Sequence, residues 1–410
     1  EQLALEMEAD GTVWSELVAG KVTGVGYIQG NGKMNPNPIE DNPDMTVDMS
    51  DEEFNSYYDV ETASFDPVAL FDNVFFILVP SENPDGRTWN TRTNGNGFDL
   101  NRDNTYQTQP ETQAMTGLIA QWNPISLHEI HGYYSQFQVE PCSPTHDPNN
   151  EYDLFMETCL AQGEAFMAAA IANNASINSG QIPLRDYLKR TDDGSLCWEN
   201  PFDDMTSSYT PQYAMLHGAN AYTVELAWGS QDAVDATVYG MMGNARFVAE
   251  NKDELFLNQL ERYRRGIENI DEDAIRPYYV DQTDRLGADA DNFRPRYAEN
   301  QNFFPEYYLI PLNSNAQRDR AAARDMVEYL IHNRVAVMGL DEDVILPANE
   351  FRGEVRCTAG DVVVDMHQAK RNMANASLYS NLVVANWTKL YSEPVTNTAL
   401  SNSPTSAALT

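Results

Sequence analysis

Basic residues are scarce in this sequence, and lysine is the scarcest of them. The 410 residues include 26 Lys and Arg against 62 Asp and Glu, which gives a formal net charge of -36. Only six of the bases are lysine. Nucleic acids and anionic membranes are bound through basic surfaces, so neither is an expected partner. A hydrated acidic surface suits an exported protein, and we expect a secreted, extracellular location.

Long apolar runs and paired cysteines are lacking as well. No apolar run approaches the roughly 20 residues that cross a bilayer, so no membrane span is expected. The four cysteines (Cys142, Cys159, Cys197 and Cys357) form no CxxC pair, which argues against a structural zinc knuckle. In an exported chain Cys142 can pair with Cys159 or with Cys197, and free buried thiols are the alternative.

The first residues lack the signals that begin a helix. The segment "EQLALEMEAD" has apolar residues at Leu3, Leu5 and Met7, but no Ser, Thr, Asp or Asn precedes it as a cap. This pattern is typical of a helix that is entered midway. We therefore expect that natural N-terminal residues are absent from this sequence.

Apolar patterning over the first two thirds of the chain predicts alternating strands and helices. Buried strands are expected at 73–80, 124–132 and 220–228, and helices at 111–122, 152–174 and 245–270. Such alternation predicts an α/β/α layered fold around a mixed central sheet, in a domain of residues 1–265.

The last third of the chain has a different composition. Residues 266–300 are polar without clean periodicity, and we expect a linker there. Residues 301–393 predict a second, smaller α/β domain, from the strand-like 306–312, the helical 318–333 and the strand-like 335–340 and 361–366. Residues 394–410 are rich in Ser, Thr and Asn and predict a surface tail.

The turn-forming segment "NPDGRTWNTRTNGNGFDLNRDN" (83–104) follows the first predicted strand. Ligands of α/β proteins bind in loops at the ends of sheet strands. Arg92 and Arg102 each offer a planar fork that grips a carboxylate, and Asn101 can orient the same ligand. The alternative is that these arginines pair with acids on the surface.

Two predicted strands carry ionisable residues. "SLHEIHGYYSQ" contains His128 and His131, which face opposite sides if the strand continues through both. One of them can therefore be a zinc ligand while the other is a core residue. In "AYTVELAWG", Glu225 lies within an apolar strand. It is either paired for structural reasons or a base whose pKa is set by its surroundings.

Taken together, these motifs resemble the zinc carboxypeptidase family of the carboxypeptidase A and E kind. The resemblance is carried by the order and spacing of "NPDG", "RTNGNGFDLNR", the "HG" strand and "TVEL". It spans roughly residues 1–265 and implies a zinc-dependent enzyme that removes C-terminal residues from peptides or proteins.

The resemblance also implies roles for single residues. Asn101 and Arg102 match the pair that binds the substrate's terminal carboxylate, and Arg92 matches the arginine that polarises the scissile carbonyl. Glu225 matches the glutamate that activates the zinc-bound water. His131 matches the third zinc ligand, with His128 as the alternative. Tyr209 or Tyr213 can take the place of the family tyrosine that closes over the substrate.

One part of the family pattern is missing. The family's first two zinc ligands form a His-x-x-Glu motif upstream of "NPDG", whereas the first histidine here is His128. Either a missing N-terminal segment supplies these ligands, as we expect, or the protein is a metal-free pseudoenzyme that binds peptide C-termini. An amidase on the same scaffold is a further alternative. The other histidines (His146, His217, His332 and His367) are interpreted as structural or surface residues.

Overall fold

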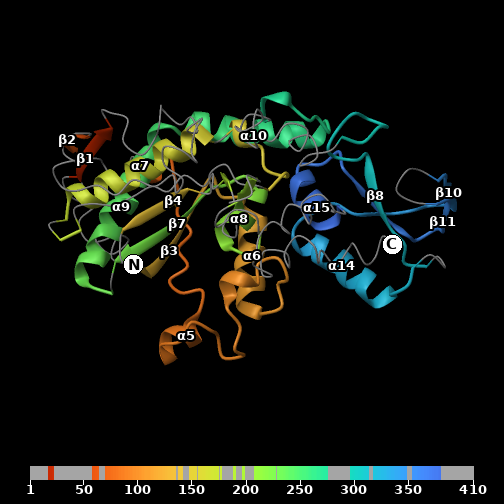
Figure 1. Ribbon diagram of the computed structural model, residues 1–410, viewed down its shortest axis with the longest axis horizontal. Helices are drawn as coiled ribbons and strands as arrows, with labels where there is room; N and C mark the ends of the chain where they lie inside the picture. Colours follow the sequence, from red (N-terminus) through yellow and green to blue (C-terminus); the bar gives the residue numbers. More distant parts are fainter. Residues whose placement is uncertain are drawn as a thin grey trace.

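The fold was analysed on a computed structural model of the chain. It describes residues 17–22, 58–63, 70–134, 137–141, 147–154, 156–174, 176–177, 188–190, 196–198, 207–227, 229–275, 296–313, 317–348 and 353–379. Helices and strands are mixed along the chain (Figure 1). None of the helices in these ranges is both long and apolar enough to cross a membrane.

A three-stranded sheet lies at the centre of the larger part of the molecule (Figure 1). β3 (Ser126–Tyr134) runs parallel to β7 (Asn220–Ala227), and β4 (Gln138–Pro141) pairs antiparallel to β7 on its other side. The predicted strands at 124–132 and 220–228 are thus confirmed. The sheet contains both strand orientations, while the complete layered fold stays a prediction.

Two long helices pack together beside this sheet. α7 (Met156–Ala172) contacts α9 (Gln231–Glu250) as well as β4 and β7. A Cβ atom at Gly240 would lie 2.4 Å from the Phe166 ring, and one at Gly243 would lie 2.5 Å from Ala169 Cβ. Only glycine permits this close approach of the two helices.

Two predicted elements are wrong in detail. The predicted helix 245–270 is two helices, because Asn251 leaves helical geometry between α9 and α10 (Lys252–Ile267). The side chain of Asn251 donates to the Phe247 carbonyl, and such local hydrogen bonds compete with the helix. The predicted buried strand 73–80 has no ladder partner among the described residues, and most of its side chains are exposed.

Further elements complete the larger part. They are β1 (Leu17–Val22), β2 (Tyr58–Ala63), α5 (Pro84–Trp89), the short helix η2 (Leu100–Arg102), α6 (Pro110–Trp122), η3 (Tyr152–Leu154), β5 (Leu188–Arg190), β6 (Leu196–Trp198), α8 (Thr210–Leu216) and η5 (Asp273–Ile275). α6 and α7 confirm the helices predicted at 111–122 and 152–174. The strand pairs β1–β2 and β5–β6 are antiparallel.

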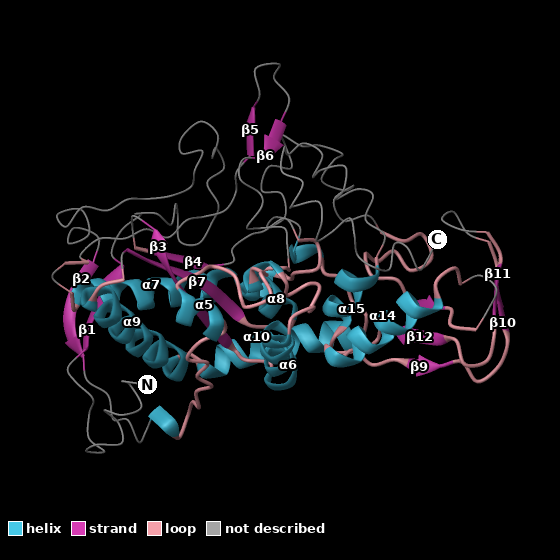
Figure 2. Ribbon diagram, turned by 90° about the horizontal axis from the view of Figure 1, so that it is seen from below, coloured by secondary structure: helices cyan, strands magenta, loops and turns pink. Residues whose placement is uncertain are grey.

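The C-terminal part contains its own small sheet. β12 (Val362–Asp365) pairs antiparallel with β8 (Tyr307–Ile310) and with β9 (Met338–Gly339). The other elements are α14 (Arg320–His332), the hairpin of β10 (Val344–Leu346) and β11 (Val355–Cys357), and α15 (Arg371–Leu378). Figure 2 shows α14 and α15 on the side of this small sheet that faces the rest of the molecule. The strand and helix types predicted here are confirmed.

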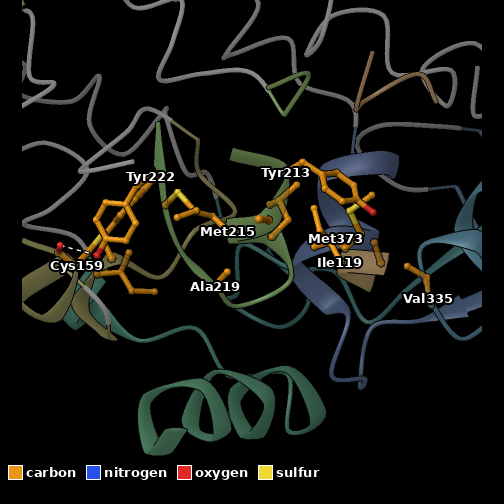
Figure 3. Close-up of a cluster of buried hydrophobic side chains, with 14 of the residues drawn as sticks. Ile119, Cys159, Tyr213, Met215, Ala219, Tyr222, Val335 and Met373 are labelled. Carbon is orange, nitrogen blue, oxygen red and sulfur yellow. Dashed lines mark hydrogen bonds between the residues drawn. The ribbon is translucent and has the colours of Figure 1, made fainter. Parts of the chain in front are cut away.

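The core is continuous between the larger and the C-terminal part. One cluster of buried side chains includes Tyr222 and Met215 from the larger part and Val335 and Met373 from the C-terminal part (Figure 3). The predicted linker 266–300 begins inside α10, and its residues 276–295 lie outside the described ranges. The two predicted units therefore share buried apolar surface, which stabilises them together.

Several predictions concern residues that the structure does not describe. These are the helix at 1–10, the tail 394–410, His146, and the pairing of Cys142 with Cys197. The pairing of Cys142 with Cys159 is wrong, because Cys159 is a free buried thiol. Burial in apolar surroundings raises the pKa of this thiol to about 12, which keeps it protonated and unreactive.

A buried lysine lies where the two parts meet. Lys370, just before α15, places its Nζ 2.6 Å from His217 Nδ1 and also donates to Asn123 Oδ1. Burial lowers the pKa of Lys370 to about 7, and the Arg262 and Arg334 guanidiniums add to this shift. Lysine in an unfolded chain has a pKa near 10.4. Between about pH 7 and 10 the unfolded state therefore binds a proton that the folded state does not.

This difference predicts a pH-dependent stability. Because the unfolded state binds more protons in that range, the free energy of unfolding should rise from pH 7 to pH 9 by roughly 2 kcal/mol from Lys370 alone. Lys370→Met should remove this rise, as measured by urea unfolding at both pH values. Lys252→Met, at a partly exposed lysine on α10, is the matched control and should keep it. An unchanged pH dependence in Lys370→Met would contradict the assignment.

Candidate active site

Hydrogen bonds from side chains to the backbone hold together the segment that precedes η2. Asn83 caps α5 by accepting from the Gly86 N–H at 2.8 Å, and its amide donates to the Arg92 carbonyl at 3.0 Å. A Cβ at Gly86 would lie 2.3 Å from Asn83 Nδ2 and 2.6 Å from the Thr91 carbonyl oxygen. The "NPDG" segment therefore forms the start of a short helix, and glycine is required where Asn83 and Thr91 approach.

Asp99 joins the two arginine-bearing ends of this loop. Its Oδ2 accepts from Arg92 Nε at 2.7 Å, and its Oδ1 accepts from the Asn101 N–H at 3.2 Å at the start of η2. The Arg92 side chain is about two-thirds exposed. Asp99 thus orients Arg92 through Nε alone, so the two Nη atoms of the guanidinium are not used by Asp99.

His131 and Glu225 are brought together by the register of β3 and β7. They are direct partners in the parallel ladder, and His131 Nδ1 lies 3.9 Å from Glu225 Oε1. Glu129, two residues earlier on the same face of β3, places its Oε2 2.9 Å from His131 Nε2. The imidazole is therefore held from one side by Glu129, and its Nδ1 is directed toward Glu225.

His128 lies on the opposite face of β3. Its ring stacks on Tyr222 at 4.3 Å and on Phe166 at 5.0 Å, within the core formed with α7. Burial of the ring lowers the pKa of His128 to about 3. The strand continues through both histidines, so that only His131 shares a face with Glu225.

The N-terminus of α8 connects the loop residues to this pair. The Thr210 N–H donates to Asn101 Oδ1 at 2.9 Å, and the Thr210 hydroxyl donates to Glu129 Oε1 at 3.1 Å. Thr210 uses the side-chain oxygen of Asn101, so the side-chain N–H groups of Asn101 can donate to other acceptors. The preceding residue, Tyr209, carries the Arg102 guanidinium 4.0 Å above its ring centroid.

Tyr213, the alternative to Tyr209, has a structural environment. It is fully buried, and its hydroxyl lies 3.3 Å from the Thr116 carbonyl and also donates to Asn333 Oδ1. Figure 3 shows its ring inside the buried cluster. Of the two tyrosines, Tyr209 is the one beside Arg102.

Acidic groups dominate the electrostatics of this site. Burial raises the pKa of Glu82 to about 8, with Glu129 and Asp99 adding to the rise and His131 opposing it. In the described part of the chain Glu82 Oε1 is buried without a hydrogen-bond partner. Burial lowers the pKa of His131, but the Glu129 and Glu225 carboxylates outweigh it and raise the value to about 9. At neutral pH the site thus holds an imidazolium between two carboxylates.

The described residues can be compared with the zinc site that the resemblance implies. An imidazole whose second nitrogen is held by a carboxylate is a common zinc ligand, and His131 with Glu129 fits that arrangement. Among the described residues, however, no group of three or more His, Cys, Asp or Glu side chains could hold a metal ion. His131 therefore fits as one ligand, and the described residues do not complete the set.

Four residues of this site were not singled out from the sequence as functional. Glu129 lies two residues before His131, and in a strand such residues are on the same face, so the motif itself indicates that the two side chains are neighbours. Asp99 lies within the segment that suggested the arginines. Glu82 and Thr210 gave no signal, because their roles depend on contacts between segments that are far apart in the sequence.

The predicted residues meet in one region through these contacts. Arg92 and Asn101 are joined by Asp99, Asn101 and Glu129 by Thr210, and Glu129 with Glu225 flanks His131. Comparisons with protein-family models, with curated proteins and with solved structures each found no match to this chain.

Proposed function

We propose that the chain is a zinc-dependent metallocarboxypeptidase, which hydrolyses the C-terminal peptide bond of peptides or proteins. The observation that carries the proposal is the convergence of a carboxylate-binding pair with an acid-base pair. Asn101 and Arg102 lie at the N-terminus of α8, and Thr210 of the same helix contacts Glu129 beside His131 and Glu225. The resemblance of the sequence to zinc carboxypeptidases implies the same roles for these residues, and it does not depend on the geometry described here.

Asn101 and Arg102 would bind the free carboxylate of the substrate. The Arg102 guanidinium lies 4.0 Å from the Tyr209 ring centroid, its Nη1 donates to the Asn101 carbonyl at 2.7 Å, and a planar guanidinium can exchange such a bond for two N–H contacts to a carboxylate. Asn101 has its oxygen fixed by Thr210 and can donate from its amide nitrogen. Fixing the last residue of a peptide in this way sets which bond reaches Glu225.

Glu225 would act as the general base and then return the proton to the leaving amine. Its carboxylate faces His131 across the β3–β7 ladder, with 3.9 Å between Oε1 and Nδ1, and a water that contacts both side chains from the open side would be within its reach. Arg92 would stabilise the developing negative charge on the carbonyl oxygen, which is worth a few kcal/mol when a donor is aimed at that charge.

His131 would hold the zinc ion through Nδ1, with Glu129 fixing Nε2. When bound, zinc lowers the pKa of a coordinated water toward about 7 and polarises the carbonyl. The remaining ligands are not among the described residues. Four of the six histidines have other surroundings: His128 is in the core, His217 contacts Lys370, His332 contacts Thr116 and His367 contacts Asp365.

A specific observation favours a second candidate, a pseudoenzyme that binds peptide C-termini without metal. Glu129 and Glu225 flank the His131 ring at 2.9 and 3.9 Å, and two carboxylates can hold a protonated imidazole in place without a metal ion. A charged ring paired with two carboxylates is a stable arrangement by itself. In that case Asn101 and Arg102 would still bind a carboxylate.

Digestion of one peptide in two forms distinguishes the candidates. A peptide with a free C-terminal carboxylate should lose its last residue, while the same peptide with a C-terminal amide should be spared, as read by mass spectrometry. A zinc chelator should stop the trimming and added zinc should restore it. Binding of the free-acid peptide without cleavage would favour the pseudoenzyme, and release of an acyl or glutamyl group would favour an amidase.

A further inference from the structure

A chain of buried polar side chains runs from the C-terminal part of the molecule to the candidate active site. Its members are Asn333, Gln107, Asn104 and Thr210, and each is at most 6% exposed. Asn333 caps the C-terminus of α14, while Thr210 begins α8. Among the described residues Asn104 Oδ1 is buried without a partner, but the other polar atoms of these side chains are hydrogen-bonded, and such bonds between buried groups fix relative positions.

The first link is a reciprocal pair of side-chain amides. Asn333 Nδ2 donates to Gln107 Oε1 at 3.2 Å, and Gln107 Nε2 donates to Asn333 Oδ1 at 3.0 Å. Asn333 Oδ1 also accepts from the Tyr213 hydroxyl of α8. Asn333 therefore contacts both the loop that follows η2 and the helix that carries Thr210.

The backbone of Gln107 is held in an uncommon conformation. Its φ is 54°, in the left-handed region that non-glycine residues seldom adopt. Such residues persist where the surrounding structure over-determines them, and they cluster at functional sites. Here the side chain of Gln107 also donates to the Asn104 carbonyl at 3.1 Å, so the strained residue connects Asn333 to Asn104.

The last links reach the candidate site. Asn104 Nδ2 donates to the Ser208 carbonyl at 2.9 Å and to the Thr210 hydroxyl at 3.2 Å. With a donor already directed at its oxygen, the Thr210 hydroxyl has its own proton for Glu129 Oε1 at 3.1 Å or Asn101 Oδ1 at 3.3 Å, both of which belong to the candidate site. Glu129 in turn holds His131. The orientation of Thr210 thus depends on Asn104, and through it on Gln107 and Asn333.

We infer that Asn333 is a positioning residue for the candidate active site, acting through Gln107, Asn104 and Thr210. The C-terminal part is then a component of the site rather than an appended unit. The consequence for turnover rests on the proposed function. The consequence for the geometry of Thr210 does not, because the Thr210 N–H bond to Asn101 exists whatever the substrate.

The test compares, in the full chain, a substitution of the α14 C-cap residue with a control substitution inside α14. Asn333→Leu removes the amide pair, and Leu330→Ala removes a fully buried side chain of the same helix that takes no part in the polar chain. Gln107→Gly is the second test variant, because glycine adopts φ 54° without strain while the amide links are lost. It covers the case in which Asn333→Leu does not fold.

Two measurements are made on each folded variant. The first is KM and kcat on a free-acid peptide, and the second is hydrogen exchange of the segment that contains the Thr210 amide. For Asn333→Leu and Gln107→Gly we expect KM to rise by about tenfold, with a smaller change in kcat, because Asn101 loses its fixed orientation. Exchange at Thr210 should be about tenfold faster. Leu330→Ala should lower the melting temperature and leave KM and Thr210 exchange unchanged.

The readouts separate this inference from the proposed function. If the wild-type protein cleaves no peptide, the proposed enzyme fails, and faster Thr210 exchange in Gln107→Gly but not in Leu330→Ala still supports the inference. Equal exchange in all three variants would overturn it. So would a KM that is unchanged in Asn333→Leu and Gln107→Gly while the wild type is active.

Discussion

Glu225→Gln is expected to reduce kcat on free-acid peptides by about 10²- to 10⁴-fold, the range that a positioned general base contributes. Glutamine keeps the shape of the side chain opposite His131, but its amide cannot take a proton from water. Binding of a peptide end by Asn101 and Arg102 should be spared. The measurements are single-turnover cleavage and calorimetric binding of a free-acid peptide that is too short to be cleaved.

The matched control is Glu250→Gln, the same chemical change at an exposed residue of α9. Glu250 pairs with Arg246 on the surface, away from β3 and β7. Its substitution should change neither kcat nor binding. Turnover that is retained in Glu225→Gln would remove Glu225 from the role of base. Loss of peptide binding together with turnover would point instead to a structural role in the β3–β7 pair.

The sequence predicted elements well where one period dominated over a long segment. The helices α6 and α7 and the strands β3 and β7 were placed within a few residues of their observed bounds. The helix break at Asn251 was missed, because apolar residues continue at helical spacing on both sides of it. Periodicity reports which face is buried, and it is insensitive to a single residue that leaves helical geometry.

The segment 73–80 shows the limit of reading burial from composition. Its apolar run predicts a buried strand, yet Phe75 is 66% exposed. The centroid of its ring lies 5.5 Å from that of the Trp122 ring. A β-strand requires a neighbouring strand to pair with as well as an apolar pattern, and the sequence of the segment does not indicate whether such a neighbour is present. Alternation and apolar content are therefore necessary signals for a buried strand, but they are not sufficient.

The candidate site was predictable in its residues and not in its connections. Opposite faces for His128 and His131 follow from the period of a strand, and the structure places them so. The contact of Thr210 with both Asn101 and Glu129 joins three segments, and no local pattern contains it. The same is true of Asn333 and Gln107, which are 226 residues apart.

Arg371→Met is expected to lower the free energy of unfolding by about 3–5 kcal/mol, the usual cost of removing one member of a buried ion pair. Arg371 and Glu151 are both fully buried, and Arg371 Nη2 donates to Glu151 Oε1 at 3.0 Å. Arg371 Nη1 donates to the carbonyls of Arg265 and Ile270, and the guanidinium lies 3.8 Å from the centroid of the Phe304 ring. In a chain of this size each kcal/mol corresponds to about 1 °C in melting temperature.

The size of the loss comes from what remains after the substitution. Glu151 would keep the Asn372 amide at 3.2 Å and the more distant Arg262 and Arg265 at 3.8 and 3.9 Å, but its carboxylate would lose its closest charged partner inside the protein. Arg371→Met combined with Glu151→Leu should not recover this loss, because the Arg262 side chain, which is 5% exposed, would then lose the Glu151 carboxylate 3.8 Å away. Arg246→Met, at a surface pair, should cost only about 0.5 kcal/mol. If Arg371→Met were as mild as this control, the buried ion pair would not be what holds the C-terminal part against α10. Thermal and urea unfolding of the four proteins decide between these outcomes, since a shared core with Val335 and Met373 alone would leave the Arg371 variants nearly unchanged.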